Sequence, residues 1–248
     1  MNVDLILLAA IGGYLLGSLS FARIVTALAG PGKRVPEETE AKIKESPHSL
    51  RLTTVSATSV SLTAGPRLGF LTYLLDMTKV FIPVLVLKKL YPGDPYYLIA
   101  AVTGVAGHVW PIYHRFKGGG GISAIFGGIF AIDWLGVFAT SIGGMILGLT
   151  VFRDVYLIYY LGLILLIPWL WFRFHDIHLV VYAVVVNILF FLASYPGAKR
   201  YYELKRTDPA WKDPKVAWRL WAMGRGILKM MEKLGLSKKM KDEETKPE

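Results

Sequence analysis

The stretch ISAIFGGIFAIDWLGVFATSIGGMILGLTV, residues 122–151, decides the fold. It is 30 residues long and almost wholly apolar, whereas one helix needs roughly 20 residues to cross the hydrocarbon of a membrane. Asp133 and Trp134 interrupt it near the middle. The stretch therefore forms either one over-long span or two short spans that meet at Asp133.

The rest of the chain is that of a membrane protein. Of its 248 residues 54% are hydrophobic, and the mean hydropathy is +0.45. The apolar runs are continuous and show no alternation, which indicates helices rather than barrel strands. The sequence thus predicts an all-α, polytopic integral membrane helical bundle. Its other runs are Leu5 to Ala29, Leu68 to Leu87, Tyr97 to Tyr113, Val155 to Phe172 and Ile177 to Tyr195.

The distribution of charge favours two spans in the deciding stretch. The net charge is +10, and basic residues gather in the loop 31–66 and from Lys199 onward. Two spans place both basic segments on one side, together with Arg115 and Lys117, as the positive-inside rule prefers. We therefore expect about seven transmembrane helices, a multi-pass protein and a cytoplasmic C-terminus. A helix over 118–134 would be about 25 Å long, short for a bilayer unless the membrane thins or the loop before it dips inward.

The chain divides by pattern into a membrane domain, residues 1–202, and a basic tail, residues 203–248. Apolar residues recur at helical spacing from Pro214 to Met240, with Trp218 and Trp221 beside basic residues. This pattern indicates an amphipathic helix lying on anionic lipid. The alternative is a cytosolic helix packed on a partner or on the protein's own loops. Nucleic-acid binding is not expected beside a membrane domain, and nothing indicates the oligomeric state.

The segment HRFKGGGGIS, residues 114–123, is the strongest candidate for chemistry. Four glycines that precede a helix leave backbone N–H groups unpaired near the positive end of the helix dipole, and Lys117 adds a full charge. Lys117 and Gly118, Gly119, Gly120 and Gly121 could thus cradle an anion. A hinge or a tight helix contact is the alternative.

Polar residues inside the spans are the other candidates. Asp76 and Lys79 lie one helical turn apart and can pair, either in a functional site or as a lock between helices. His108 could be a general base or could merely bind a carbonyl. Ser18 could bind a phosphate or substrate, or it could, with Gly17, let another helix approach closely. Thr58 lies in a segment rich in hydroxyls that could bind a phosphate or could be a plain loop.

Four segments carry a resemblance to a known family. YLLGSLSF, SATSV, LDMTKVFIPVLV and GHVWPIYHRFKGGGGIS are similar, in order and spacing, to motifs of the integral-membrane acyl-phosphate:glycerol-3-phosphate acyltransferases of bacteria. The resemblance implies seven spans, a cytoplasm-facing site, and acyl transfer from acyl phosphate to glycerol 3-phosphate to give lysophosphatidic acid in phospholipid synthesis. It implies no metal and no cofactor.

The chain departs from the family pattern at several positions. Residues 51–54, Arg-Leu-Thr-Thr, stand where the family has G-S-G-N, and Gly120 stands where the family has the second lysine of its glycine loop. The family's arginine downstream of GATNV falls at Leu62, with Arg67 five residues later. The closing His-x-x-Asn is missing from residues 192–201, where only Lys199 and Arg200 offer charge.

The resemblance therefore implies a divergent acyltransferase of the plasma membrane. In it Lys117 and the glycine amides bind one phosphate, and Thr58 and its neighbours bind the other phosphate or the glycerol. Asp76 and Lys79 orient the site, and His108 acts as the base. The main alternative is a catalytically silent paralogue that binds lipid phosphates or a partner enzyme. A transporter built around the intramembrane pair is a third possibility, although no inverted repeat supports it.

Overall fold

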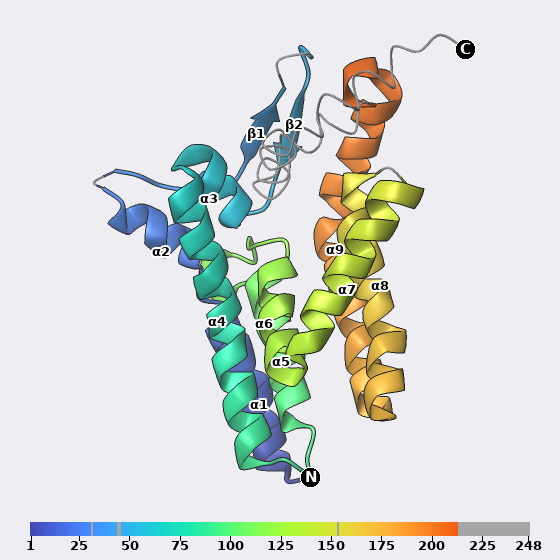
Figure 1. Ribbon diagram of the computed structural model, residues 1–248. Helices are drawn as coiled ribbons and strands as arrows, with labels where there is room; N and C mark the ends of the chain where they lie inside the picture. The colour runs from blue at the N-terminus through green and yellow to red at the C-terminus, as the bar shows by residue number, and fades with distance from the viewer. Residues whose placement is uncertain (31, 44–45, 153, 213–248) are drawn as a thin grey trace.

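The protein is a bundle of long helices with a small hairpin at one end (Figure 1). The computed structural model describes residues 1–30, 32–43, 46–152 and 154–212. Its α-helices and strands are α1 (Val3–Gly17), α2 (Phe21–Leu28), β1 (Thr39–Lys42), β2 (Ser49–Leu52), α3 (Ala57–Thr63), α4 (Pro66–Leu90), α5 (Tyr96–Val109), α6 (Ile122–Ile132), α7 (Trp134–Ile146), α8 (Val155–Phe174) and α9 (Ile177–Thr207). Short helical turns cover Ile112–His114, Leu147–Val151 and Pro209–Trp211.

The predicted helical membrane fold is confirmed. In the described part of the chain five helical segments are long and apolar enough to cross a membrane, namely Val3–Leu28, Pro66–Leu90, Trp134–Val151, Tyr156–Phe174 and Ile177–Thr207. Helices α5 and α6 have 14 and 11 residues and complete the bundle between them. The glycine loop, residues 115–121, precedes α6. The short α6 agrees with the expectation that the helix after this loop falls short of a full span.

The predicted break in the deciding stretch occurs at Asp133. The backbone of this residue is extended, with φ −151° and ψ 97°, and it separates α6 from α7. Its buried carboxylate accepts a hydrogen bond from Trp169 Nε1 at 2.8 Å and pairs with Arg173 Nε at 3.1 Å. Because a buried carboxylate is costly unless it is paired, these contacts stabilise the break.

The first apolar run, residues 5–29, forms two helices within the candidate span Val3–Leu28. Helix α1 ends at Gly17, and α2 begins at Phe21 and turns away from the bundle beside α3 (Figure 1). The Ser18 hydroxyl donates to the Tyr14 carbonyl at 2.8 Å, and the carbonyl of Leu19 accepts a hydrogen bond from the Lys79 ammonium. Since side chains satisfy the carbonyls freed at the turn, the helix can end inside the protein.

Helices α1 and α5 touch through their backbones. A Cβ atom built on Gly17 would stand 2.1 Å from the carbonyl oxygen of Gly104, and one on Gly107 would stand 2.2 Å from that of Tyr14. Only glycine fits at such a distance. The predicted role of Gly17 in close helix approach is thus confirmed.

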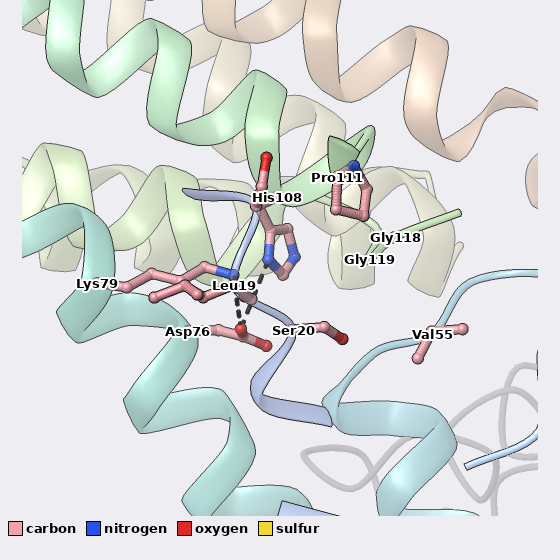
Figure 2. Close-up of a pocket in the computed structure, with 10 residues that line it drawn as sticks. Leu19, Ser20, Val55, Asp76, Lys79, His108, Pro111, Gly118 and Gly119 are labelled. Atoms are coloured by element: carbon pink, nitrogen blue, oxygen red, sulfur yellow. Dashed lines mark hydrogen bonds and ion pairs between the residues drawn. The ribbon is translucent and has the colours of Figure 1, made fainter. Parts of the chain in front are cut away.

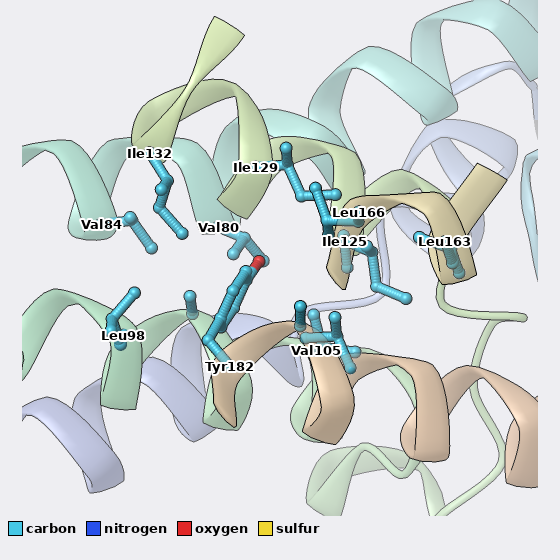
Figure 3. Close-up of a cluster of buried hydrophobic side chains, with 14 of the residues drawn as sticks. Val80, Val84, Leu98, Val105, Ile125, Ile129, Ile132, Leu163, Leu166 and Tyr182 are labelled. Atoms are coloured by element: carbon cyan, nitrogen blue, oxygen red, sulfur yellow. The ribbon is translucent and has the colours of Figure 1, made fainter. Parts of the chain in front are cut away.

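The main core lies between α4, α5, α6, α8 and α9 (Figure 3). Its side chains are aliphatic apart from the rings of Tyr182 and Phe190. Large apolar residues such as Ile11, Phe70 and Ile188 are more than half exposed on the outside. An apolar exterior of this kind suits contact with lipid. The core residues with 0% exposure are Val80, Val84, Ala101, Val105, Ala124, Ile125, Leu166, Leu170, Ala183 and Val186.

The basic loop 31–66 folds into more structure than the sequence predicts. Strands β1 and β2 pair antiparallel, with Thr39 opposite Leu52, and pack on the end of α9. Asp208 accepts hydrogen bonds from Ser46 and pairs with His48 Nδ1 at 3.0 Å. A small core holds the two parts together; its buried members are Ala41, Ile43, Leu50, Leu52, Tyr201 and Trp211.

The predicted tail helix, Pro214 to Met240, lies outside the described residues. Helix α9 continues past Tyr202 to Thr207, and the turn Pro209–Trp211 folds back on the hairpin. The division into residues 1–202 and 203–248 stays a prediction.

Candidate functional site

A small pocket lies where α4, α5, the turn between α1 and α2, and the glycine loop meet (Figure 2). Six predicted site residues line it, and they come from three stretches far apart in the sequence: Ser18, Asp76, Lys79, His108, Gly118 and Gly119. Four further residues complete the lining: Leu19, Ser20, Val55 and Pro111.

An ion pair is buried at the base of the pocket. Lys79 Nζ lies 2.9 Å from Asp76 Oδ1, and the two side chains are 3% and 2% exposed. The Lys79 ammonium also donates to the Leu19 carbonyl at 2.5 Å. The predicted pairing along one face of α4 is therefore present, and it also ties α4 to the turn after α1. A buried charge pair of this kind is costly to break from one side only.

His108 lies between the ion pair and the glycine loop. Its Nδ1 is 3.6 Å from Asp76 Oδ1, slightly longer than a hydrogen bond, and the residue is 5% exposed. Within the described residues its Nε2 has no hydrogen-bond partner, and it faces Gly119 so closely that a Cβ there would stand 2.2 Å from it. With a proton on Nδ1 directed at the carboxylate, Nε2 is left as a proton acceptor at the pocket.

The glycine loop is held against α5 by its backbone. Arg115 and Phe116 adopt left-handed conformations, φ 52° and 61°, which reverse the chain after the turn Ile112–His114. The Gly119 N–H donates to the His108 carbonyl at 3.0 Å, and the Gly118 carbonyl accepts from the Val55 N–H at 2.8 Å. Left-handed backbone at non-glycine residues is uncommon, and it often marks a site whose geometry matters.

Three amides of the loop remain free. Across the described ranges, the N–H groups of Gly118, Gly120 and Gly121 donate to no protein acceptor. Gly121 has φ +91°, a conformation that favours glycine, and precedes the first residue of α6. These groups point to the anion cradle predicted from the sequence, because helical bonding has not consumed them.

Four predicted residues do not line the pocket. Gly120 and Gly121 lie farther along the loop, and Thr58 lies in the first turn of α3. Lys117 is 57% exposed and pairs with the Glu37 carboxylate outside the pocket. Of the predicted anion site, the pocket therefore holds Gly118 and Gly119, while Lys117, Gly120 and Gly121 lie outside it.

Sequence reasoning missed Arg23 and Glu37. Arg23 donates to the Lys117 carbonyl at 3.1 Å and to the Ser20 hydroxyl at 3.2 Å, so α2 is bonded to the glycine loop. An arginine in an otherwise apolar run was the available sequence indication. In the described residues, no group of three or more His, Asp or Glu could hold a metal ion.

Comparison with known proteins decides the family. The sequence pattern described as glycerol-3-phosphate acyltransferase matches residues 7–202. The chain belongs to the glycerol-3-phosphate acyltransferase family. The described structure is similar to the crystal structure of the integral membrane glycerol 3-phosphate acyltransferase PlsY in its glycerol 3-phosphate form. The TM-score is 0.66 at 24% identity, over 80% of this chain and 92% of that one.

Curated relatives in this family match over part of their length. The glycerol-3-phosphate acyltransferase of Pelagibacter ubique is 35% identical over 127 residues, which are 51% of this chain and 59% of that protein. That of Aquifex aeolicus is 31% identical over 143 residues, 53% of this chain and 67% of that protein. The match to the first relative thus spans less than two thirds of its length.

Two departures of this family member from the motif pattern meet in space. Arg51 and Leu52, which stand in place of the first half of G-S-G-N, belong to β2, and Leu52 is buried in the hairpin core. Arg200, from the segment that lacks His-x-x-Asn, donates to the Arg51 carbonyl at 3.2 Å. Arg67 is exposed in the first turn of α4.

Proposed function

We propose that this chain transfers an acyl group from acyl phosphate to the first hydroxyl of glycerol 3-phosphate, forming lysophosphatidic acid for phospholipid synthesis. The observation that carries the proposal is the free Nε2 of buried His108, directed at a glycine loop in which the amides of Gly118, Gly120 and Gly121 are also free. The family, and relatives named glycerol-3-phosphate acyltransferase, support this chemistry.

In the proposed reaction, His108 Nε2 accepts the proton of the glycerol hydroxyl as its oxygen attacks the acyl carbonyl carbon. The bond between that carbon and the bridging phosphate oxygen breaks, and the phosphate leaves with the electron pair. Asp76 holds the ring and stabilises the imidazolium, while Lys79 keeps the buried carboxylate charged. The free amide of Gly118, which lines the pocket, stabilises the departing phosphate, and the free amides of Gly120 and Gly121 follow it along the loop.

Acyl phosphate and glycerol 3-phosphate are the proposed substrates, with no cofactor. We place the protein in the plasma membrane, with the hairpin end, the basic tail and the C-terminus on the cytoplasmic side. Glycerol 3-phosphate would then reach the pocket from the cytoplasm, and Thr58 and the basic tail would lie on the same side, where anionic lipid can bind the tail.

The direct test gives the purified full chain palmitoyl phosphate and labelled glycerol 3-phosphate. We expect lysophosphatidate from the native protein and a loss of about 10²- to 10⁴-fold in kcat for His108→Ala, the usual contribution of a general base. His178→Gln is the matched control, because His178 pairs with Asp176 at 3.0 Å on the surface, away from the pocket. Equal rates for native protein and His108→Ala would refute the assigned base.

A gain of function is also expected at Gly120. A Cβ there meets nothing within 4 Å, so Gly120→Lys can return the second lysine of the family motif without a clash. An added cation beside free amides should lower the KM for a phosphate substrate by about three- to tenfold.

A catalytically silent binding protein is the second candidate. Its support is Leu52, which is 7% exposed and holds the hairpin core at a position where the family motif has a serine. No product from acyl phosphate or from acyl carrier protein, with phosphate binding retained, would favour this alternative.

A further inference from the structure

A cluster of cations surrounds one carboxylate just outside the pocket. Lys117 Nζ lies 2.5 Å from Glu37 Oε2. This ion pair, the largest cause, and the nearby charges of Arg23 and Arg115 hold the pKa of Glu37 below its usual range. Arg23 lies in α2, and Arg115 and Lys117 lie at the start of the glycine loop. Arg23 and Arg115 are 92 residues apart in the sequence. Three positive charges around one negative charge leave a net attraction for a further or a stronger anion.

Contacts with neighbouring residues fix the positions of Arg23 and Glu37 in this cluster. Arg23 is half-buried, and its guanidinium bonds both the Ser20 hydroxyl and the Lys117 carbonyl, which fixes its position at the loop. Glu37 follows closely after Val35, which is 8% exposed and packs with Ala22 in a small core. Both the arginine and the carboxylate are therefore placed by buried neighbours in the chain.

The position of the cluster suits a phosphate. Gly120 and Gly121, whose amides are free, follow Lys117 within four residues, and there is open space at Gly120. A phosphate monoester carries more charge than a carboxylate and accepts more hydrogen bonds, so it can replace a carboxylate among the same donors.

We infer that Arg23, Arg115 and Lys117 form a binding site for a terminal phosphate at the mouth of the pocket, and that Glu37 occupies this site until a phosphate displaces it. The family motif has a lysine at the position of Gly120, and this lysine places a positive charge on the glycine loop. In this chain Arg23, from α2, supplies a positive charge in its place. The site rests on the proposed function for the identity of its ligand, since both proposed substrates end in a phosphate, but phosphate binding itself can be measured without catalysis.

The test is a titration of the full chain in neutral detergent with inorganic phosphate and with glycerol 3-phosphate. Glu37→Gln removes the internal competitor and should tighten binding about two- to fivefold, the effect of an exposed ion pair. Arg23→Gln should weaken binding about tenfold, because it removes one charge-assisted contact. Glu40→Gln is the matched control, since Glu40 pairs with Lys42 at 3.4 Å on the exposed hairpin, and it should change nothing.

The outcomes separate the site from the proposed activity. Shifts in opposite directions for Glu37→Gln and Arg23→Gln, with no shift for Glu40→Gln, support the site even if no lysophosphatidate is made. Unchanged binding in both variants, or no phosphate binding by the native protein, overturns it even if the protein is an active acyltransferase. In an active protein, an Arg23→Gln effect on the KM of glycerol 3-phosphate alone assigns the site to the soluble substrate, and an effect on the KM of acyl phosphate alone assigns it to the lipid one.

Discussion

Gly119→Ala tests the contact between the glycine loop and His108. The added Cβ would stand 2.2 Å from His108 Nε2 and 2.7 Å from Cε1, whereas ordinary contacts begin near 3.4 Å. The ring or the loop must therefore move by about 1.2 Å, the difference between 3.4 and 2.2 Å. Since a misplacement of about 1 Å in an active site can cost roughly 100-fold in rate, we expect a loss of that order in kcat/KM.

The assay is lysophosphatidate formation from palmitoyl phosphate and labelled glycerol 3-phosphate, measured beside thermal unfolding in detergent. We expect overpacking to reduce the free energy of unfolding by about 1–3 kcal/mol, so the variant should remain folded at assay temperature. Gly120→Ala is the control, because a Cβ there meets nothing within 4 Å. Full activity in Gly119→Ala, or equal losses in both variants, would refute the reasoning that His108 acts across Gly119.

Three further predictions concern stability. Lys79→Met should lower the free energy of unfolding, measured by chemical unfolding, by about 3–5 kcal/mol, because it leaves Asp76 charged and buried. Adding Asp76→Leu should recover most of that loss. The double variant should still show no activity in the acyltransferase assay. Gly17→Ala should lower the melting temperature, because its Cβ would stand 2.1 Å from a backbone oxygen. A Cβ on Gly12 meets nothing within 4 Å, so Gly12→Ala should raise the melting temperature slightly through its higher helix propensity. A lower melting temperature for both variants would contradict this. Hydrogen bonds from Ser46 and His48 lower the pKa of Asp208 in the folded protein, so its stabilising effect is complete above the unfolded value of about 4 and is lost as the pH falls through the lowered folded value. Asp208→Asn should therefore melt below the native protein at pH 7, and the difference in melting temperature should shrink as the pH falls below about 4. A difference that does not change with pH would rule out this origin.

The parts of the fold that sequence could predict are those governed by hydropathy and charge. Asp133 in an apolar run and the placement of basic loops together predicted the break between α6 and α7, because a charged residue is costly inside a helix that faces lipid. The end of α1 at Gly17 could not be predicted in this way. It depends on Lys79, which is 60 residues from the Leu19 carbonyl that it satisfies.

The candidate site shows the same division. Intramembrane polar residues and the glycine run predicted Asp76, Lys79, His108 and Gly119, because such residues are costly in a membrane unless they meet one another. Glu37 and Arg23 were missed because their importance arises from contacts between α2, the loop after it and the glycine loop. Local patterns in a single sequence do not report such contacts.

The shortness of α6 has a consequence for how an acyl donor would arrive. Its 11 residues extend about 16 Å, roughly half the hydrocarbon thickness, and the loop before it lies well below the upper ends of α7 and α9 (Figure 1). In the proposed membrane orientation the loop would lie at or below the level of the lipid head groups. An acyl phosphate could then diffuse laterally within one leaflet and present its acyl-phosphate group at the pocket. Its acyl chain would stay in the hydrocarbon of the bilayer throughout.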